Sequence, residues 1–308
     1  MKRSLWLEEI SSELTPLPSL EGDHVADVAI VGGGFVGLWT ALQIVELDPK
    51  CKVIIIERDI CGGGASGRNG GFVMSWWPKI SSLSAQCGKD EAVRLARASA
   101  AAIGEIEQFC IEHNIDAHFR RAGWLWTATT NAQRGAWKDV VKTCQRLGES
   151  VFLPLSNNEV ARRAGSVKHL EGVLEVSNAT VQPARLVRGL RKVALEKGIK
   201  IFEKTSMSNL ERSSPAVLQT PNGSITATRV VLAHNAWSAE IPELRRTILP
   251  VTSTIVATAP IPDRLEKIGW TGGEAITDSQ LMVDYYRTTQ DGRIAFGKGT
   301  GMISFASR

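Results

Sequence analysis

The chain has 308 residues, 43% of them hydrophobic and 22% charged, with a formal net charge of +4. This length and composition predict a globular protein with one large domain or two smaller ones. The positive charge is weak and scattered, which argues against a nucleic-acid-binding protein.

Cysteine, histidine and apolar patterns argue against several further classes. The five cysteines contain no CxxC pair and the five histidines no HxxxH pair, so we expect neither a disulfide framework nor a metal site. The N-terminus lacks the apolar core of a signal peptide, and the apolar stretch 25–47 is interrupted by Asp27 and four glycines. We therefore expect no membrane span, reduced thiols and a cytoplasmic protein.

The first part of the chain predicts a strand–helix–strand unit. The run DVAIV at 27–31 is typical of a buried parallel strand, and apolar spacing predicts a helix over 35–47. A second apolar run at 52–56 predicts the next strand. Between the first strand and the helix lies GGGFVG, 32–37, which matches the dinucleotide-binding pattern G-x-G-x-x-G.

Each motif position has a separate task in binding a dinucleotide. Gly32 permits the tight turn, Gly34 lets the backbone approach a pyrophosphate, and Gly37 lets the helix pack closely on the strand. Glu57 ends the second strand at the spacing expected of an acid that accepts hydrogen bonds from ribose hydroxyls. This acid disfavours NADP, whose extra phosphate it would repel, and leaves NAD or FAD.

The segment CGGGASGRNGGFV, 61–73, separates these two cofactors. A run so rich in glycine is either a flexible linker or a rigid cradle whose backbone touches a ligand. In a plain NAD-binding fold a helix would soon follow the second strand, so the glycine segment favours FAD.

The patterns in the rest of the chain predict further helices and strands, some of which we expect in the cofactor-binding domain. A long helix over 90–114 is expected on the cofactor-binding domain, and strands over 207–218 and 224–233 are expected to return to that domain. The remaining predicted elements are strands at 119–130, 172–178, 199–202, 251–259 and 281–289 and helices at 131–147 and 183–198.

Three stretches together resemble the D-amino-acid-oxidase-like FAD-dependent oxidoreductases, namely DVAIVGGGFVGLWTAL, IIIERD and GASGRNGGFV. Within this family the gamma-glutamylputrescine oxidases are the most similar branch, through segments such as FRRAGWLWTAT, VVLAHNAWS and YYRTTQDGRIAFGKG. The resemblance implies an α/β (α+β) fold, in which a Rossmann-like FAD-binding domain is interleaved with a mainly antiparallel-sheet substrate domain. The implied segments are 1–115 and 183–240 for the FAD-binding domain and 116–182 and 241–308 for the substrate domain.

The resemblance also implies FAD bound in an extended form along the glycine motifs. His234 occupies a place where relatives carry smaller residues, so we expect a surface or internally satisfied histidine there. For Arg68 an intramolecular ion pair is the alternative to a cofactor contact. The implied FAD-binding residues are Gly32, Gly34, Gly37, Glu57, Arg58, Ala65, Ser66, Arg68, Asn69, Gly70, Gly71, Met207 and Ala233.

The implied reaction is oxidation of a small-molecule amine, resembling gamma-glutamylputrescine or an amino acid, with hydride transfer to the flavin. Imine hydrolysis and peroxide formation would follow, with dioxygen or another electron acceptor as the second partner. Trp76 and Trp77 could wall the substrate pocket, with core packing as the alternative. Tyr285 and Arg287 share one strand face, and Arg287 could bind a substrate carboxylate. No side chain is identified as a catalytic base.

The resemblance extends from about Trp6 to Gly299, and the terminal GTGMISFASR does not match the second glycine-rich loop with which relatives continue. Two hypotheses therefore remain, an FAD-dependent amine oxidoreductase and a truncated, catalytically inactive dinucleotide-binding remnant. An NAD dehydrogenase is a third and weaker alternative.

Overall fold

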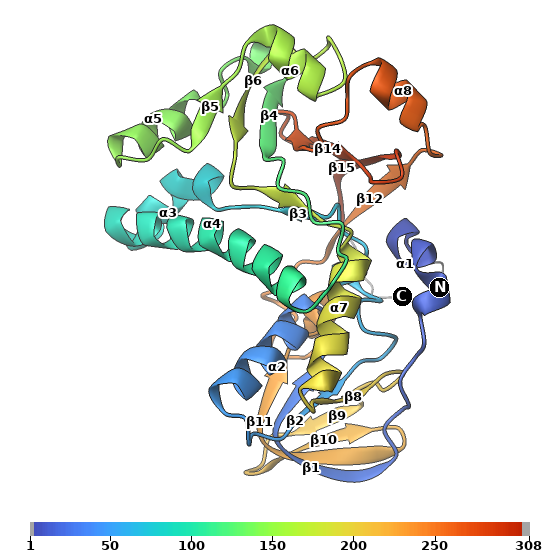
Figure 1. Cartoon of the computed structure of the whole chain (residues 1–308). Helices are drawn as coiled ribbons and strands as arrows, with labels where there is room; N and C mark the ends of the chain where they lie inside the picture. Colours follow the sequence, from blue (N-terminus) through green and yellow to red (C-terminus); the bar gives the residue numbers. More distant parts are fainter. Residues whose placement is uncertain (1–2, 304–308) are drawn as a thin grey trace.

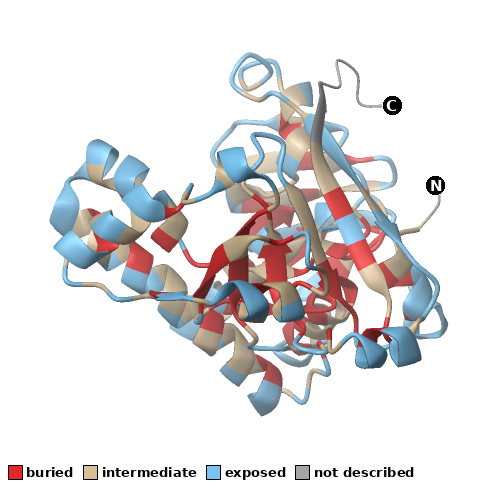
Figure 2. Cartoon of the chain, turned by 90° about the horizontal axis from the view of Figure 1, so that it is seen from above, coloured by how far each residue is buried: buried red, intermediate tan, exposed pale blue. Residues whose placement is uncertain are grey.

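The computed structural model describes the backbone of residues 3–303 and the side chains of residues 3–299. Two main sheets lie at opposite ends of the molecule, and helices α3 and α4 lie between them (Figure 1). Buried residues are concentrated in the strands and on the helix faces that cover them (Figure 2).

The first sheet has six strands in the order β8-β2-β1-β11-β10-β9. The strands β8, β2, β1 and β11 are parallel, and β10 and β9 extend the sheet in antiparallel fashion. Their bounds are β1 Gly22–Val31, β2 Val53–Ile56, β8 Lys200–Phe202, β9 Asn209–Glu211, β10 Ala216–Thr220 and β11 Gly223–Leu232.

Period-two burial in β1 explains how this sheet is packed. Val28 and Ile30 face the helices α2 (Phe35–Leu47) and α7 (Pro183–Glu196), whereas Ala29 and Val31 belong to a second cluster on the opposite face. A strand that is buried on both faces reads as a continuous apolar run, which is why DVAIV predicted a parallel strand.

The second sheet has seven strands in the order β12-β15-β14-β13-β4-β6-β5 and is antiparallel except for the β13–β4 pair. Its bounds are β4 Trp124–Ala128, β5 Phe152–Pro154, β6 Glu171–Glu175, β12 Val251–Ala257, β13 Ala275–Thr277, β14 Asp284–Thr288 and β15 Ile294–Ile303. A short pair, β3 Phe72–Val73 and β7 Ala179–Thr180, lies outside both sheets. The remaining helices are α1 Leu5–Glu9, α3 Ile80–Cys87, α4 Lys89–Glu112, α5 Lys138–Arg146, α6 Asn157–Arg163 and α8 Pro262–Lys267.

These two sheets confirm the predicted fold class, while the proposed segment boundaries stay a prediction. The predicted helix 35–47 matches α2, but the predicted helix 131–147 is shorter. Its α-helical part begins only at Lys138, because Gly135 adopts a φ of +73° that interrupts the helix.

The long helix α4 corrects the expectation that it belongs to the cofactor-binding domain alone. Ala92 and Ala96 in its first half pack into the core of the seven-stranded sheet, whereas Phe109 packs against the α2 and α7 side of the first sheet. The helix therefore joins both cores. Within the described residues, no helix combines the length and apolar character needed to cross a bilayer.

His169 is a buried titratable residue in the core beside the second sheet. Its Nδ1 lies 3.0 Å from the Thr127 hydroxyl, and its Nε2 contacts the Tyr286 hydroxyl. Burial lowers the pKa of His169 from its ordinary value. His169 therefore binds a proton less readily in the folded protein than in the unfolded chain, where its pKa is about 6.5. The free energy of unfolding should accordingly fall as the pH drops below that value.

We expect the His169→Gln variant to lose less stability than the wild type between pH 7.5 and 5.5. The difference should be at most about 1.4 kcal/mol per pH unit, the limit for one proton. Urea unfolding at both pH values measures it. An equal loss in both proteins would show that His169 binds a proton as readily in the folded state as in the unfolded state.

Candidate dinucleotide and substrate site

A large cavity opens at the carboxyl ends of β1, β2 and β11, where parallel α/β sheets bind their ligands. Its volume is about 1640 Å³, well beyond the range typical of pockets for drug-sized molecules. An extended dinucleotide is a ligand of suitable size and shape.

The predicted glycine motif forms one wall of this cavity. Gly32 has a φ of +116°, and a Cβ atom there would lie 2.5 Å from the Ala233 carbonyl oxygen. At Gly37 a Cβ would overlap the Gly32 carbonyl oxygen, so the first turn of α2 can approach β1 only without a side chain. Gly34 lines the cavity itself, and a Cβ there would lie 2.8 Å from Ser66 Oγ.

The N-terminus of α2 points backbone N–H groups at this cavity. The Phe35 N–H donates to Ser66 Oγ at 2.9 Å. The N–H groups of Gly34, Val36 and Gly37 have no acceptor within the described part of the chain. Unpaired donors at a helix N-terminus, together with the helix dipole, bind phosphate groups.

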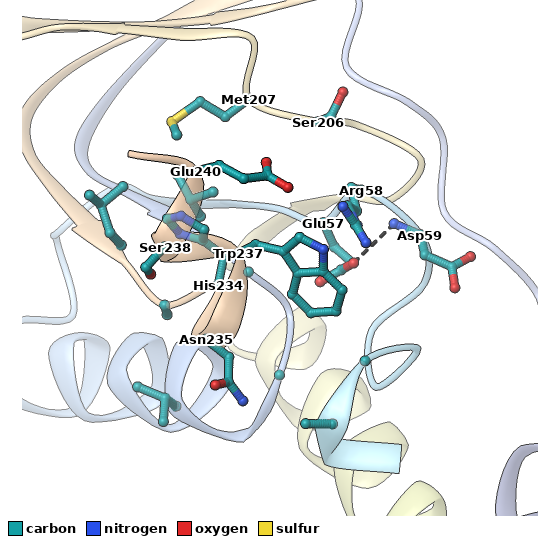
Figure 3. Close-up of a pocket in the computed structure, with 18 of the residues that line it drawn as sticks. Glu57, Arg58, Asp59, Ser206, Met207, His234, Asn235, Trp237, Ser238 and Glu240 are labelled. Carbon is teal, nitrogen blue, oxygen red and sulfur yellow. Dashed lines mark hydrogen bonds between the residues drawn. The ribbon is translucent and has the colours of Figure 1, made fainter. Parts of the chain in front are cut away.

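Glu57 is held at the edge of the cavity by two backbone donors. Its Oε2 accepts from the Gly33 N–H at 2.8 Å. Its Oε1 accepts from the Asp59 N–H at 2.9 Å, the bond drawn in Figure 3. Burial raises the pKa of Glu57, and these two donors oppose that shift. Each carboxylate oxygen can accept a further hydrogen bond, so the side chain remains able to bind two ribose hydroxyls.

The opposite wall comes from the segment after β11. Trp237 stacks on the guanidinium of Arg58, with 4.0 Å between the Arg58 Cζ and the ring centroid. Met207 lines the same cavity (Figure 3). Trp237 was not among the predicted site residues, although it lies in the VVLAHNAWS segment that carried the family resemblance.

His234 also lines the cavity, and this corrects the expectation of a surface or internally satisfied histidine. Its Nδ1 is buried without a hydrogen-bond partner in the described structure, and burial lowers its pKa. His234 follows Ala233 just after the end of β11, and the carboxyl end of that strand lies at the edge of the cavity.

The glycine segment after β2 is ordered by its own hydrogen bonds, so it is a cradle. Asn69 donates to the carbonyls of Ala65 and Ser66 at 3.1 and 3.0 Å and accepts from the Gly71 N–H at 2.8 Å. Arg68 Nε donates to the Gly63 carbonyl at 2.8 Å. Within this segment Ala65, Ser66, Arg68 and Asn69 line the large cavity, whereas Gly70 and Gly71 do not.

A second cavity of about 300 Å³ adjoins the first. Tyr285 packs on Gly70 and on the edge of Phe72, and its hydroxyl lies 3.3 Å from Ser253 Oγ. Arg68, Asn69 and Ser253 line both cavities, so the two lie side by side.

The structure supports the packing alternative for Trp77 and places Trp76 at the surface. Trp77 is 2% exposed and packs in the core with Ile80 and Trp124, which agrees with the core-packing alternative. Trp76 is 48% exposed. Neither residue lines either of the two cavities.

Arg287 does not reach a substrate cavity either. Its side chain is buried, Nε donates to the Gly70 carbonyl at 2.8 Å, and Nη2 donates to the Val181 carbonyl at 2.5 Å. Burial lowers its pKa to about 10. The guanidinium therefore supports the glycine segment from behind, while Tyr285 alone of the predicted substrate residues borders a cavity.

A close-packed glycine turn, unpaired helix donors and a correctly placed acid fit a cofactor with a pyrophosphate and a ribose. The chain is thus a dinucleotide-binding protein of the Rossmann-like class. Comparison with protein families narrows this class, because the family described as FAD dependent oxidoreductase (DAO) matches residues 27–306. The chain belongs to that family, and its cofactor is FAD.

Individual relatives agree with the family. The gamma-glutamylputrescine oxidoreductase of Escherichia coli is 28% identical over 293 residues, covering 94% of this chain and 68% of that protein. A probable oxidoreductase, OrdL, of Rhizobium meliloti is 30% identical over 298 residues, covering 95% of this chain and 68% of that protein. Among solved structures, glycine oxidase from Geobacillus kaustophilus aligns with a TM-score of 0.71 and 23% identity over 92% of this chain and 74% of its own.

Proposed function

We propose that the chain oxidises a small-molecule amine at the junction of the two cavities, with FAD held along the larger one. The observation that carries this proposal is that the two cavities adjoin and share Arg68, Asn69 and Ser253. The larger cavity is lined by groups that can bind phosphate and ribose. The smaller cavity is bordered by Phe72, Ile255 and Tyr285 and has space for a small substrate.

In the reaction, the C–H bond beside the amine nitrogen breaks and the nitrogen loses a proton, which leaves an imine. FAD, held by Glu57 and by the N–H groups at the start of α2, would supply the acceptor for the hydride, and dioxygen or another acceptor would then take the two electrons. Water adds to the imine and releases the carbonyl product. The aromatic lining of the smaller cavity removes water from the amine, which lowers its pKa and favours the neutral form that can react.

The proposed substrate class follows the names of the relatives, gamma-glutamylputrescine for one and glycine for another. Arg287 donates to backbone carbonyls, so it is not proposed to bind a substrate carboxylate. The feature that we propose the site recognises is the amine group, which both substrates share. All five cysteines are free, which supports the proposal of a reducing, cytoplasmic location.

The purified protein should be yellow, and its flavin absorbance should bleach when the amine is added without oxygen. Gamma-glutamylputrescine and glycine are the first substrates to compare, by stopped-flow absorbance. The Tyr285→Phe variant keeps the ring over Gly70 and removes the hydroxyl, so it should retain FAD and bleach more slowly.

Two other outcomes would contradict the proposal. A protein that binds FAD but bleaches with no amine would support the inactive dinucleotide-binding remnant. Equal bleaching rates in the wild type and Tyr285→Phe, with unchanged substrate dependence, would remove Tyr285 from the substrate site.

A further inference from the structure

The N-terminal residues 3–10, which precede the first sheet, pack against the glycine segment that borders both cavities. Trp6 and Leu7 are buried, and together with Ile10 they form a cluster with Ile60, the residue directly before that segment. None of these N-terminal residues belongs to the dinucleotide motif.

Three polar contacts fix the N-terminal residues to Asp59, just before the segment, and to two points within it. Arg3 pairs with Asp59, with 2.9 Å from Nη2 to Oδ1. Ser4 Oγ donates to the Gly67 carbonyl at 2.5 Å, and Trp6 Nε1 donates to the carbonyl of Asn69 at 2.8 Å.

The Trp6 bond has a directional consequence at the second cavity. In a planar trans peptide the C=O and the next N–H point in opposite directions. Holding the Asn69 carbonyl against the indole therefore turns the Gly70 N–H away from the indole. Gly70 lines the second cavity, and its N–H has no acceptor within the described chain.

Trp6 is itself clamped, so its indole can act as a fixed donor. Its carbonyl accepts from Gln182 Nε2 at 2.8 Å. The Arg287 guanidinium covers the ring at 4.9 Å from its centroid and also holds the Gly70 carbonyl. The peptide groups on both sides of Gly70 are thus oriented by side chains from the first ten residues and from β14.

We propose that residues 3–10 form a strap that sets the conformation of the glycine segment for FAD, and that Trp6 is a positioning residue for cofactor binding. The proposal rests on FAD as the cofactor and is independent of which amine is oxidised. Its chemistry is the presentation of the segment's backbone donors where the two cavities adjoin, with the Gly70 N–H on the side of the smaller one.

The test compares Trp6→Phe with Trp137→Phe in the flavin-loaded protein. Both changes shrink a buried indole to a phenyl ring, but Trp137 lies in the core of the seven-stranded sheet, away from the strap. Trp6→Phe should raise the FAD dissociation constant roughly two- to thirteen-fold, the range for the net contribution of one hydrogen bond. Trp137→Phe should leave it within about two-fold.

An FAD dissociation constant that is unchanged in Trp6→Phe, with only a lower melting temperature, would overturn the proposal, because Trp6 would then be a structural residue alone. If Trp6→Phe does not fold, Ser4→Ala removes the Gly67 contact with less disturbance, and an unchanged dissociation constant in that variant would overturn the proposal equally. Trypsin cleavage after Arg68 gives a readout that needs no flavin. Cleavage should be faster in Trp6→Phe than in Trp137→Phe, and equal rates would also contradict the strap.

Discussion

Replacing Gly37 with alanine is expected to abolish FAD retention and to lower the free energy of unfolding by about 3 kcal/mol or more, as overpacking against a rigid neighbour does. The added methyl group would overlap the Gly32 carbonyl oxygen, which is backbone and cannot rotate away. Relief requires α2 to move off β1, and that movement displaces the N–H groups of Gly34 and Val36 from the cavity. Flavin content after gel filtration and urea unfolding measure the two effects.

Gly104 offers a matched control, because it is also a helical glycine. A Cβ there would lie 3.4 Å from the Arg121 guanidinium, an ordinary contact with a flexible side chain. Gly104→Ala should therefore raise stability by about 0.5–1 kcal/mol, the gain expected from helix propensity, with normal flavin content. Loss of flavin in Gly104→Ala, or its retention in Gly37→Ala, would show that close packing of α2 on β1 is not what the cradle requires.

Replacing Arg287 with alanine is expected to cost about 3 kcal/mol of folding stability and to weaken FAD retention. The change leaves the carbonyls of Gly70 and Val181 buried without donors, at about 1–3 kcal/mol each. It also removes the cover over Trp6. Arg287→Lys should be intermediate, because one ammonium group cannot reproduce the forked geometry of a guanidinium.

Thermal melting and flavin content distinguish this role from substrate binding. A structural role predicts that Arg287→Lys loses flavin and stability together, whereas a substrate role predicts a stable, fully yellow protein with a raised KM for the amine. Arg162→Ala, which removes an exposed partner of Glu159 on α6, should change neither quantity appreciably.

The cofactor half of the site was predictable from sequence because its signals are local. The glycine spacing, the helix that follows and the acid after β2 lie within one continuous stretch, and each has a backbone reason to be where it is. The Asp48-Pro49 pair likewise marks the end of α2.

The substrate half was not predictable because its contacts join distant segments. The position of Trp77 after the glycine segment indicated a pocket wall, but the turn at 77–79 directs it into the core with Trp124. Strand alternation placed Arg287 on the same face as Tyr285, yet its partners, the carbonyls of Gly70 and Val181, belong to other parts of the chain.

The helix α1 was missed because five residues give too short a periodic signal, although Ser4 does cap it.

The pairing of β1 with β11 affects how the protein is made. Gly22 pairs with Gly223, so the central strands of the nucleotide-binding sheet are about 200 residues apart in sequence. During synthesis at about 5–20 residues per second, β1 must wait roughly 10–40 s for its neighbour to emerge. In that interval β1 can pair with β2, but the backbone groups on its other edge stay without their native partner until β11 arrives.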